Sequence, residues 1–271
     1  MDNSTPYQLA VVGCGAMGTG LIRALVEPDT PHSAADIIAA DTEPSRRVAV
    51  EQLGVAVTDD AAEAVQQAEV ILLAVKPQVL SQLLLELVPI LRTRLLISIA
   101  AGVPLSQYEA ALGPQASVVR VMPNILCTVG AAASAYCANS ACSSEQIEYV
   151  ADLLNAIGTS VAVAEELMDA VTGLSGSGPA FVAIFIEALI DGGVAAGLAR
   201  EQATDLATQT VLGTARWLQL QGGSPSALKD MVTSPAGTTI AGIKALEERG
   251  LRAAVMEAVA AAARRSRELG S

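Results

Sequence analysis

The chain has 271 residues, which is enough for two domains with separate hydrophobic cores. Its formal net charge of −12 disfavours nucleic acid and acidic membrane surfaces as partners, because phosphate binding depends on clustered Lys and Arg. Four cysteines without paired metal-ligand spacing and a single histidine disfavour a zinc site, so we expect no bound metal. The thiols are expected to be free in a reducing cytoplasm, since the first residues lack the pattern of a secretory signal.

The first glycine motif follows a predicted strand at residues 9–12 and leads into a predicted helix that runs to Val26. Its residues are Gly13-Cys14-Gly15-Ala16-Met17-Gly18, a G-x-G-x-x-G in the strand, turn and helix context that dinucleotide binding requires. The first glycine permits the turn, the second lets the backbone approach a pyrophosphate, and the third allows close helix packing. The alternative interpretation is a glycine turn that serves packing alone.

A second predicted strand, residues 37–40, ends in Asp41, where dinucleotide folds carry the acid that binds a ribose. Strands and helices continue to alternate, with a capping box expected at Asp60–Glu63. Further strands are expected at 55–57, 70–75, 95–99, 118–122, 131–136 and 160–163, and helices at 44–53, 104–112 and 143–158. This alternation predicts an α/β fold with a parallel sheet.

Three of these strands end in residues suited to a ligand cleft: Lys76, then Ala100-Ala101-Gly102, then Asn124. Ligands of open parallel sheets bind outside the carboxyl ends of the strands, so we expect these residues to face one crevice. For Lys76 the alternative is a solvated lysine on a loop.

The alternation stops after residue 163, and the chain is predicted to be helical from there to its end. We therefore expect a Rossmann dinucleotide-binding domain at residues 1–163 and an all-α domain at residues 164–271.

The helical part contains a run from Gly173 to Leu198 that is apolar around nearly its whole circumference. The glycines before Pro179 predict a tight leading loop, whose amides at a helix N-terminus would suit a carboxylate. Glu187, Asp191 and a Gly-Gly pair make the run a poor membrane span. We therefore expect this helix to be buried, and to be shared with a second subunit.

The blocks Ala74-Val75-Lys76-Pro77, Ser98–Val103, Met122-Pro123-Asn124, Leu174–Ala180 and Leu228–Ile240 together resemble the pyrroline-5-carboxylate reductase family. The block 228–240 is similar to the family signature, and the resemblance covers essentially the whole chain. It implies a Rossmann domain followed by a helical dimerisation domain, assembly as a homodimer with the decamer as a further assembly, and synthesis of proline. It also implies NADPH or NADH as cofactor and a small-molecule substrate.

The resemblance implies which residues would hold the two ligands. The cofactor-binding residues would be Gly13, Cys14, Gly15, Ala16, Met17, Gly18, Asp41, Ala74, Val75, Lys76, Pro77, Ala100, Ala101 and Gly102. The substrate-binding residues would be Asn124, Ser175, Gly176, Ser177, Gly178, Gly237, Thr238 and Thr239. The Thr238 hydroxyl would hydrogen-bond the imine nitrogen, whereas the alternative role of Thr238 is to cap the helix ahead of Ile240.

A missing acid favours an imine substrate. Hydroxyacid dehydrogenases that resemble this chain carry a lysine and an asparagine where Val182 and Ile186 stand here. A protonated imine is already a strong electrophile, so its reduction needs no such acid. The alternatives are a hydroxyacid-type or other NAD(P)-dependent oxidoreductase on the same scaffold, and a non-catalytic dinucleotide-sensing protein.

The chain also departs from the family pattern. Ile125-Leu126 replaces the usual Thr-Pro, Ala236 replaces a glycine, and Gly223-Ser224 replaces a common Glu-His. The fourth departure is Asp41, which favours NADH because its carboxylate would repel a 2′-phosphate. Arg46 and Arg47 stand close by and could neutralise that phosphate, although a solvated position is the simpler interpretation for Arg47.

Overall fold

The computed structural model describes residues 5–27, 30 and 32–270. The chain forms two compact units, Met1–Ser177 with Ala261–Ser271 and Gly178–Ala260, which we call the sheet unit and the helical unit. The domain boundary predicted after residue 163 is a different division, and it stays a prediction.

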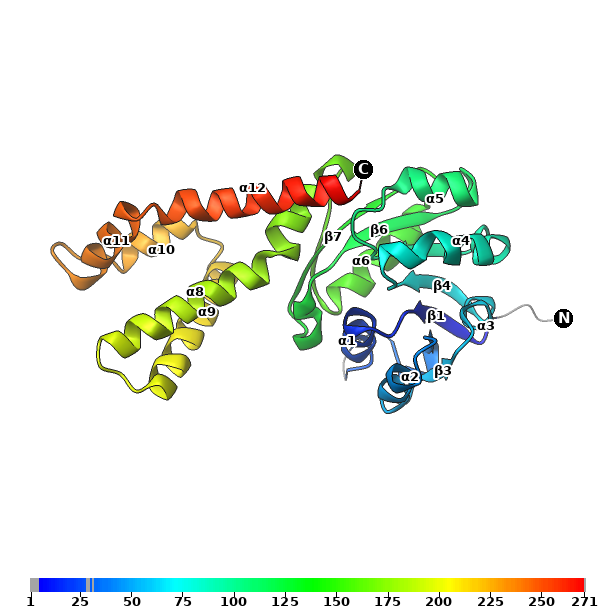
Figure 1. The fold of residues 1–271 in the computed structure, drawn as a ribbon, viewed down its shortest axis with the longest axis horizontal. Helices are drawn as coiled ribbons and strands as arrows, with labels where there is room; N and C mark the ends of the chain where they lie inside the picture. The colour runs from blue at the N-terminus through cyan, green and yellow to red at the C-terminus, as the bar shows by residue number, and fades with distance from the viewer. Residues whose placement is uncertain (1–4, 28–29, 31, 271) are drawn as a thin grey trace. The chain divides into compact units, whose positions relative to one another are not determined.

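Within the described residues the sheet unit holds one sheet of eight strands, in the order β3-β2-β1-β4-β5-β6-β7-β8 (Figure 1). The strands are β1 Tyr7–Val12, β2 Ile37–Ala40, β3 Ala56–Thr58, β4 Ala68–Leu73, β5 Leu95–Ser98, β6 Val118–Met122, β7 Ala132–Ala138 and β8 Gly158–Ala162. The first six strands are parallel, and their order 3-2-1-4-5-6 is that of a dinucleotide-binding fold. The predicted fold class is confirmed, but β7 runs antiparallel to β6, which the sequence did not predict.

Helices cover both faces of the sheet because successive strand residues point to opposite sides. Leu9 and Val11 contact the helices of one face, and Ala10 and Val12 those of the other. The first face carries α1 Ala16–Leu25, α2 Pro44–Glu51 and α6 Ser144–Asn155. The second carries α3 Ala61–Gln66, α4 Pro77–Leu91, α5 Leu105–Leu112 and α7 Met168–Val171. Short 3-10 turns lie at η1 Ala34–Asp36, η2 Ile125–Val129 and η3 Glu165–Leu167.

The capping box predicted at Asp60–Glu63 forms only in part. The Asp60 carboxylate accepts the Ala62 N–H, as an N-cap should. Glu63 does not reach back to the cap, because its carboxylate accepts a hydrogen bond from the Thr58 hydroxyl at the end of β3.

The outer strand β8 is partly closed by a side chain. Val163 donates its N–H to Tyr136 of β7, so the N–H of Ser160, an odd number of residues away, points to the outer edge. There the Ser160 N–H and hydroxyl both donate to the Asn155 carboxamide oxygen, at 2.9 Å each.

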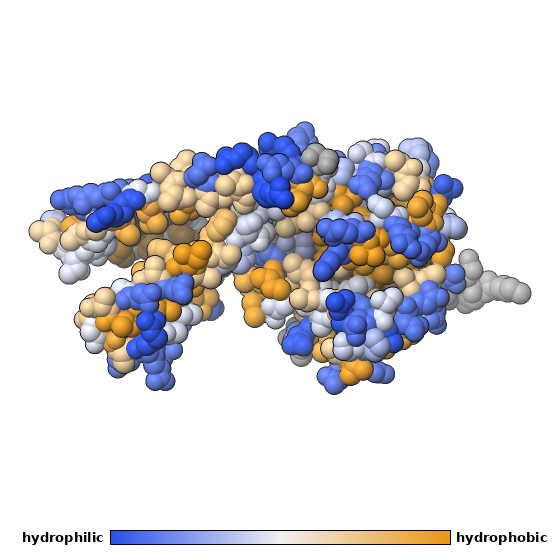
Figure 2. All heavy atoms as spheres, in the orientation of Figure 1, coloured by the Kyte–Doolittle hydropathy of each residue, from blue (hydrophilic) through white to orange (hydrophobic). Residues whose placement is uncertain are grey.

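The helical unit consists of α8 Gly178–Ala195, α9 Arg200–Gln221, α10 Pro225–Met231, α11 Thr238–Glu248 and the first half of α12 Leu251–Leu269. Helices α8 and α9 form a hairpin, in which Gly193 lets the Ala203 side chain approach closely. Among described hydrophobic residues of this unit, only Ala203 and Ala207 are buried. Apolar residues therefore lie at the surface of the helical unit, as Figure 2 shows.

The loop predicted before Pro179 is wrong. Residues 165–195 are continuously helical, with a π-helical turn, η4 Thr172–Gly176, where the glycines lie. The Ser177 N–H bonds to the Thr172 carbonyl, five residues back. A proline in a helix cannot donate to the carbonyl four residues earlier and its ring crowds that group, so a widened turn before Pro179 relieves the clash. By length and composition this helix could cross a membrane, but a single such helix is weak evidence for a span, because helices of soluble proteins pass the same test.

Candidate functional site

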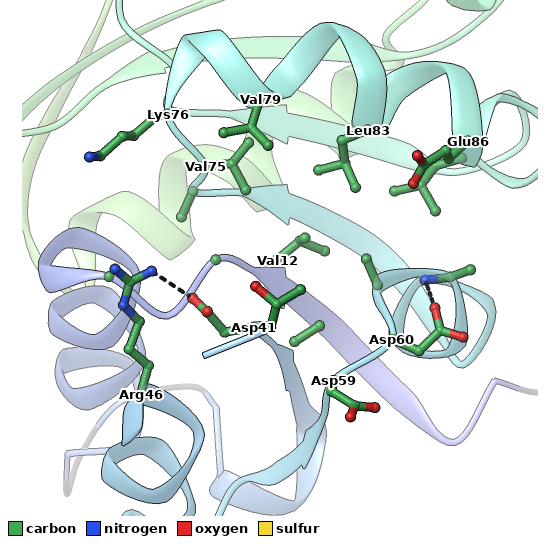
Figure 3. A pocket seen from close by; sticks show the side chains of 18 of the residues that line it. Val12, Asp41, Arg46, Asp59, Asp60, Val75, Lys76, Val79, Leu83 and Glu86 are labelled. Atoms are coloured by element: carbon green, nitrogen blue, oxygen red, sulfur yellow. Dashed lines mark hydrogen bonds and ion pairs between the residues drawn. The ribbon is translucent and has the colours of Figure 1, made fainter. Parts of the chain in front are cut away.

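A cavity of about 700 Å³ lies at the carboxyl ends of β1, β2 and β4 (Figure 3). Seven of the predicted cofactor-binding residues line it: Gly13, Gly15, Ala16, Asp41, Ala74, Val75 and Lys76. The fold therefore brings half of the predicted cofactor set into one space. Cys14, Met17, Gly18, Pro77, Ala100, Ala101 and Gly102 are not among its lining residues.

The three motif glycines meet three different constraints. Gly13 has φ +102°, and a Cβ there would lie 2.7 Å from the Ala74 carbonyl oxygen. A Cβ on Gly18 would lie 1.9 Å from the Gly13 carbonyl oxygen, so α1 could not pack against the loop. Nothing lies within 4 Å of a Cβ built on Gly15, the N-cap of α1. Gly15 therefore leaves open space where a helix N-terminus offers amides to a phosphate.

At Cys14 it is the backbone N–H, and not the thiol, that takes part in the site. The thiol is buried and contacts the Ala40 carbonyl at 3.7 Å. Burial and then the nearby Asp41 carboxylate raise the thiol's pKa to about 12, so it stays protonated at neutral pH. The Cys14 N–H donates to Asp41 Oδ2 at 2.8 Å, which links the glycine loop to the end of β2.

The Asp41 carboxylate is held in place by several donors. Besides the Cys14 amide, the Glu43 N–H donates to Oδ1 at 2.9 Å and Arg46 donates to Oδ2 at 3.4 Å. The side chain is only 6% exposed. Its orientation is thus set before any ligand binds, and Figure 3 shows the Asp41 side chain among those that line the cavity.

The two arginines beyond Asp41 have different roles. Arg46 is half exposed, pairs with the Asp41 carboxylate and lines the cavity. Arg47 donates to the Asp41 carbonyl at 2.7 Å, so the expectation that Arg47 is simply solvated is wrong. The fixed guanidinium of Arg47 satisfies a strand-end carbonyl, which leaves Arg46 as the arginine that faces the cavity.

Lys76 lines the cavity together with three acids other than Asp41. It is the N-cap of α4 and borders the space from the β4 side, with Asp59 and Asp60 opposite and Glu86 farther along α4 (Figure 3). None of these acids was predicted as a site residue. For Glu86 a signal was present on α4, where Val79, Leu83 and Glu86 follow a helical spacing and line one wall, whereas Asp59 and Asp60 lie between β3 and α3.

The Ala100–Gly102 turn starts where β5 leaves the sheet. Ile99 still donates its N–H to the Leu73 carbonyl at 3.1 Å, whereas the Ala100 N–H turns to the Ser98 hydroxyl at 3.3 Å. Gly102 has φ +77°, and its Cα lies against Gly270 at the end of α12. A Cβ on Gly270 would lie 2.5 Å from the Gly102 carbonyl oxygen, so this contact needs a glycine at position 270, whereas at position 102 it is the positive φ that favours glycine.

Asn124 is buried, at 3% exposure, and both the oxygen and the nitrogen of its carboxamide make hydrogen bonds. Its oxygen accepts from the N–H groups of Leu126 and Ala133, and its nitrogen donates to the Ser175 carbonyl at 3.0 Å. That carbonyl has no helical partner, because Pro179 has no N–H. Asn124 thus links the start of η2 to the Ser175 carbonyl by hydrogen bonds, and its contact with substrate stays a prediction.

The other predicted substrate residues lie on two segments. Ser175 and Gly176 belong to the π-helical turn, where a Cβ on Gly176 would lie 2.6 Å from Met122 Cε, and Ser177 directly follows it. These residues form a π-helical turn and the bend after it rather than an open loop, and that their amides bind the substrate carboxylate stays a prediction. Gly178 begins α8, and Gly237, Thr238 and Thr239 lie at the start of α11. That these segments form one substrate site stays a prediction.

Thr238 does not cap its helix. The N-cap of α11 is Gly237, and the Thr238 side chain makes no hydrogen bond within the part of the chain that the structure describes. The exposed Thr238 hydroxyl is therefore available to a ligand. In the described residues no cluster of three or more His, Cys, Asp or Glu could hold a metal ion.

Two family models match the chain. Residues 165–269 match the model described as pyrroline-5-carboxylate reductase dimerisation. Residues 8–102 match that of NADP oxidoreductase, coenzyme F420-dependent.

Curated relatives and solved structures match nearly the full length. A pyrroline-5-carboxylate reductase of Methanosarcina acetivorans is 48% identical over 97% of this chain and 98% of its own. The Escherichia coli enzyme is 36% identical over 97% and 98%. The Plasmodium falciparum pyrroline carboxylate reductase, solved with NADP bound, is 32% identical with a TM-score of 0.88 over 99% of this chain and 100% of that one. The corresponding Coxiella burnetii structure has a TM-score of 0.91 at 32% identity, over 98% and 99%.

Proposed function

The chain belongs to the pyrroline-5-carboxylate reductase family, and from this premise we infer that it reduces 1-pyrroline-5-carboxylate to L-proline with a nicotinamide dinucleotide. The observation that carries the inference is the cavity at the glycine motif, where Gly15 is open and Asp41 is fixed, in a chain that matches these reductases end to end. The reaction is the last step of proline biosynthesis.

The chemistry needs little beyond placement of the two reactants. A hydride leaves the reduced nicotinamide for the imine carbon, the C=N electron pair moves to the protonated nitrogen, and the products are the secondary amine and the oxidised cofactor. The Thr238 hydroxyl, which has no intrachain partner among the described residues, hydrogen-bonds the imine nitrogen. Gly237 and Thr238 offer the first amides of α11 to the substrate carboxylate. Asn124, Ser175, Gly176, Ser177, Gly178 and Thr239 complete the proposed substrate site.

The cofactor crosses the sheet where the strand order reverses, between β1 and β4. Its pyrophosphate lies at the glycine motif and its adenosine ribose at Asp41. The nicotinamide half then extends toward the ends of β4 and β5, past Ala74–Pro77 and Ala100–Gly102.

We propose that the enzyme prefers NADH. The Asp41 carboxylate is pinned by two backbone amides and cannot swing away from a 2′-phosphate. Two like charges a few ångströms apart repel by about 1–4 kcal/mol, depending on the effective dielectric. Asp59, Asp60 and Glu86 add negative charge around the same cavity. Arg46 opposes this effect, but its guanidinium is already paired with Asp41.

The helical unit makes the enzyme a homo-oligomer, and we propose a dimer in the cytoplasm, with decamers as the larger assembly. The support is the match to a dimerisation model and the exposed apolar surface of α8–α12.

The test is oxidation of NADH and of NADPH, followed by absorbance, with 1-pyrroline-5-carboxylate as second substrate. We expect turnover with both cofactors and a lower KM for NADH. Absence of turnover with both would overturn the proposed reaction, whereas a clearly lower KM for NADPH would overturn only the cofactor preference.

A further inference from the structure

The turn that follows β5 is shaped by a buried hydroxyl pair. The Ser98 side chain accepts the Ala100 N–H, so the chain leaves the sheet one residue after its last ladder bond. The Ser98 hydroxyl is in turn 2.6 Å from the Tyr108 hydroxyl, and both residues are 0% exposed. No water can replace either hydroxyl at such a position without an opening of the core, so each fixes the other.

Tyr108 is itself rigidly held. It lies in the first half of α5, where the Leu105 N–H donates to the Glu165 carboxylate at 2.6 Å. The same carboxylate pairs with the buried Arg120 at 3.2 Å. Burial raises the pKa of Tyr108 to about 12, so its hydroxyl keeps its proton at physiological pH. A chain of contacts therefore runs from Glu165 through α5 and Tyr108 to Ser98 and the Ala100 amide.

The Ala100–Gly102 turn lies next to one wall of the cavity. The Leu73 carbonyl, which ends β4, receives the Ile99 N–H, so the Ala100 turn lies directly beside the Ala74–Lys76 wall of the cavity. Asp41 lies on the opposite side of the glycine motif, at β2. If the adenosine ribose is at Asp41, the nicotinamide end of the cofactor reaches the β5 side, where a shift of the turn changes the angle and distance of hydride transfer.

We propose that Tyr108 is a positioning residue for the reaction, which acts through the Ser98 hydroxyl to hold the Ala100–Gly102 turn against the nicotinamide half of the cofactor. The proposal rests on the proposed function. Tyr108 is completely buried, so it touches neither substrate nor cofactor, and it lies outside the sequence motifs.

The test compares Tyr108→Phe with Tyr149→Phe. Both variants lose one buried hydroxyl, but the Tyr149 hydroxyl has no hydrogen-bond partner among the residues that the structure describes. We expect Tyr108→Phe to lower kcat, at saturating NADH and pyrroline-5-carboxylate, by about three- to tenfold. Its Kd for ADP-ribose, which ends before the nicotinamide ring, should stay within about twofold of the unmodified value because that site is distant. Tyr149→Phe should leave kcat and this Kd unchanged.

Ser98→Ala gives a second, independent route to the same result. It should lower kcat to a similar extent, and the double variant should be no slower than the slower single variant by more than about twofold, since the two residues act in series. A normal kcat in Tyr108→Phe with a lowered melting temperature would overturn the proposal, because it would show a structural role alone. Multiplied losses in the double variant would also overturn it. Failure of the proposed function is distinguishable, because the unmodified protein would then show no turnover.

Discussion

The sheet unit and the helical unit use similar apolar residues in opposite ways. In the sheet unit Leu9, Ile37 and Ile97 are completely buried. In the helical unit Ile184 is 65% exposed and Phe185 is 40% exposed, and none of the α8 residues is buried. The sheet unit satisfies its apolar side chains within the chain, whereas the helical unit does not. One sequence thus encodes a self-sufficient domain and a domain that is completed by another subunit.

The free energy gained by burying these exposed side chains is large compared with the stability of a domain. Complete burial of one such side chain contributes about 1.5–3 kcal/mol, and a native domain is stable by only about 5–15 kcal/mol. A second cavity of about 700 Å³ opens in the helical unit between α8, α10, α11 and α12, with Phe185, Leu246 and Val255 in its wall. An apolar hollow of this kind is typical of a protein–protein contact, and it lies in the part of the chain that matches the dimerisation model.

The largest effect should follow from a charge in that wall. Phe185→Asp should prevent assembly, because burial of an unpaired carboxylate at a subunit contact costs several kcal/mol, about 3 or more. Sedimentation at micromolar concentration measures the loss of the dimer. The matched control is Leu85→Asp, at a 73% exposed leucine of the sheet unit, which should assemble normally. If Phe185→Asp formed a dimer as tight as that of the unmodified protein, the apolar surface around Phe185 would not be a subunit contact.

The next effect concerns chemistry assigned to the helical unit. Thr238→Val should lower kcat/KM by about ten- to a hundredfold, the scale of one hydrogen bond to a charged or polarised group. The KM for NADH should barely change. Thr214→Val serves as control, since the exposed Thr214 hydroxyl only donates to a carbonyl within α9. Steady-state kinetics with unchanged turnover in Thr238→Val would exclude Thr238 from the mechanism.

A smaller effect belongs to the sheet unit, where Asp41 sets cofactor choice. Asp41→Ser should shift the ratio of kcat/KM values toward NADPH by about tenfold, since 1.4 kcal/mol corresponds to a factor of ten. It also frees Arg46 to meet a 2′-phosphate. Asp59→Ser, at the rim of the same cavity, should shift the ratio less. An unchanged ratio in Asp41→Ser would mean that the rim charges, rather than Asp41, decide the preference.

The smallest effect comes from a strained residue of the helical unit. Ala236 has φ 57°, a left-handed conformation that no other described non-glycine residue adopts, in the tight turn that the Gly237 N–H closes onto the Ser234 carbonyl. This conformation costs Ala about 1–2 kcal/mol, and glycine's greater freedom in the unfolded chain cancels about half of the gain. Ala236→Gly should therefore raise the melting temperature by about 2–4 °C.

The control for Ala236→Gly is Ala254→Gly, at an exposed helical position of α12. That change should lower the melting temperature, because glycine in a helix costs about 1 kcal/mol. Calorimetry that gives the same sign for both variants would contradict the strain argument. The strain also gives a physical reason for the glycine that the family usually has at this place.

Most of the sheet unit could be predicted from the sequence because its signals are local. The strands, the glycine motif and Asp41 can each be recognised from a few consecutive residues, and residues of these segments line the cavity. The turn at residues 173–178 was mispredicted because glycines before a proline indicate a loop, while the structure uses them for a π-helical turn close to Met122. The partner of the Ser175 carbonyl, Asn124, lies 51 residues away and had no local signal. Nor had Tyr108, whose hydroxyl partner Ser98 belongs to another element.

The Asn155 side chain at the edge of β8 has a consequence for colloidal behaviour. An open strand edge is a template on which another chain can add a strand, and proteins that lack a device against this tend to aggregate. With Asn155 already bonded to the outward N–H of Ser160, a foreign strand would have to break an existing hydrogen bond before forming its own. Asn155, the last residue of α6, thus occupies a hydrogen-bonding group at the β8 edge and disfavours the addition of a foreign strand there.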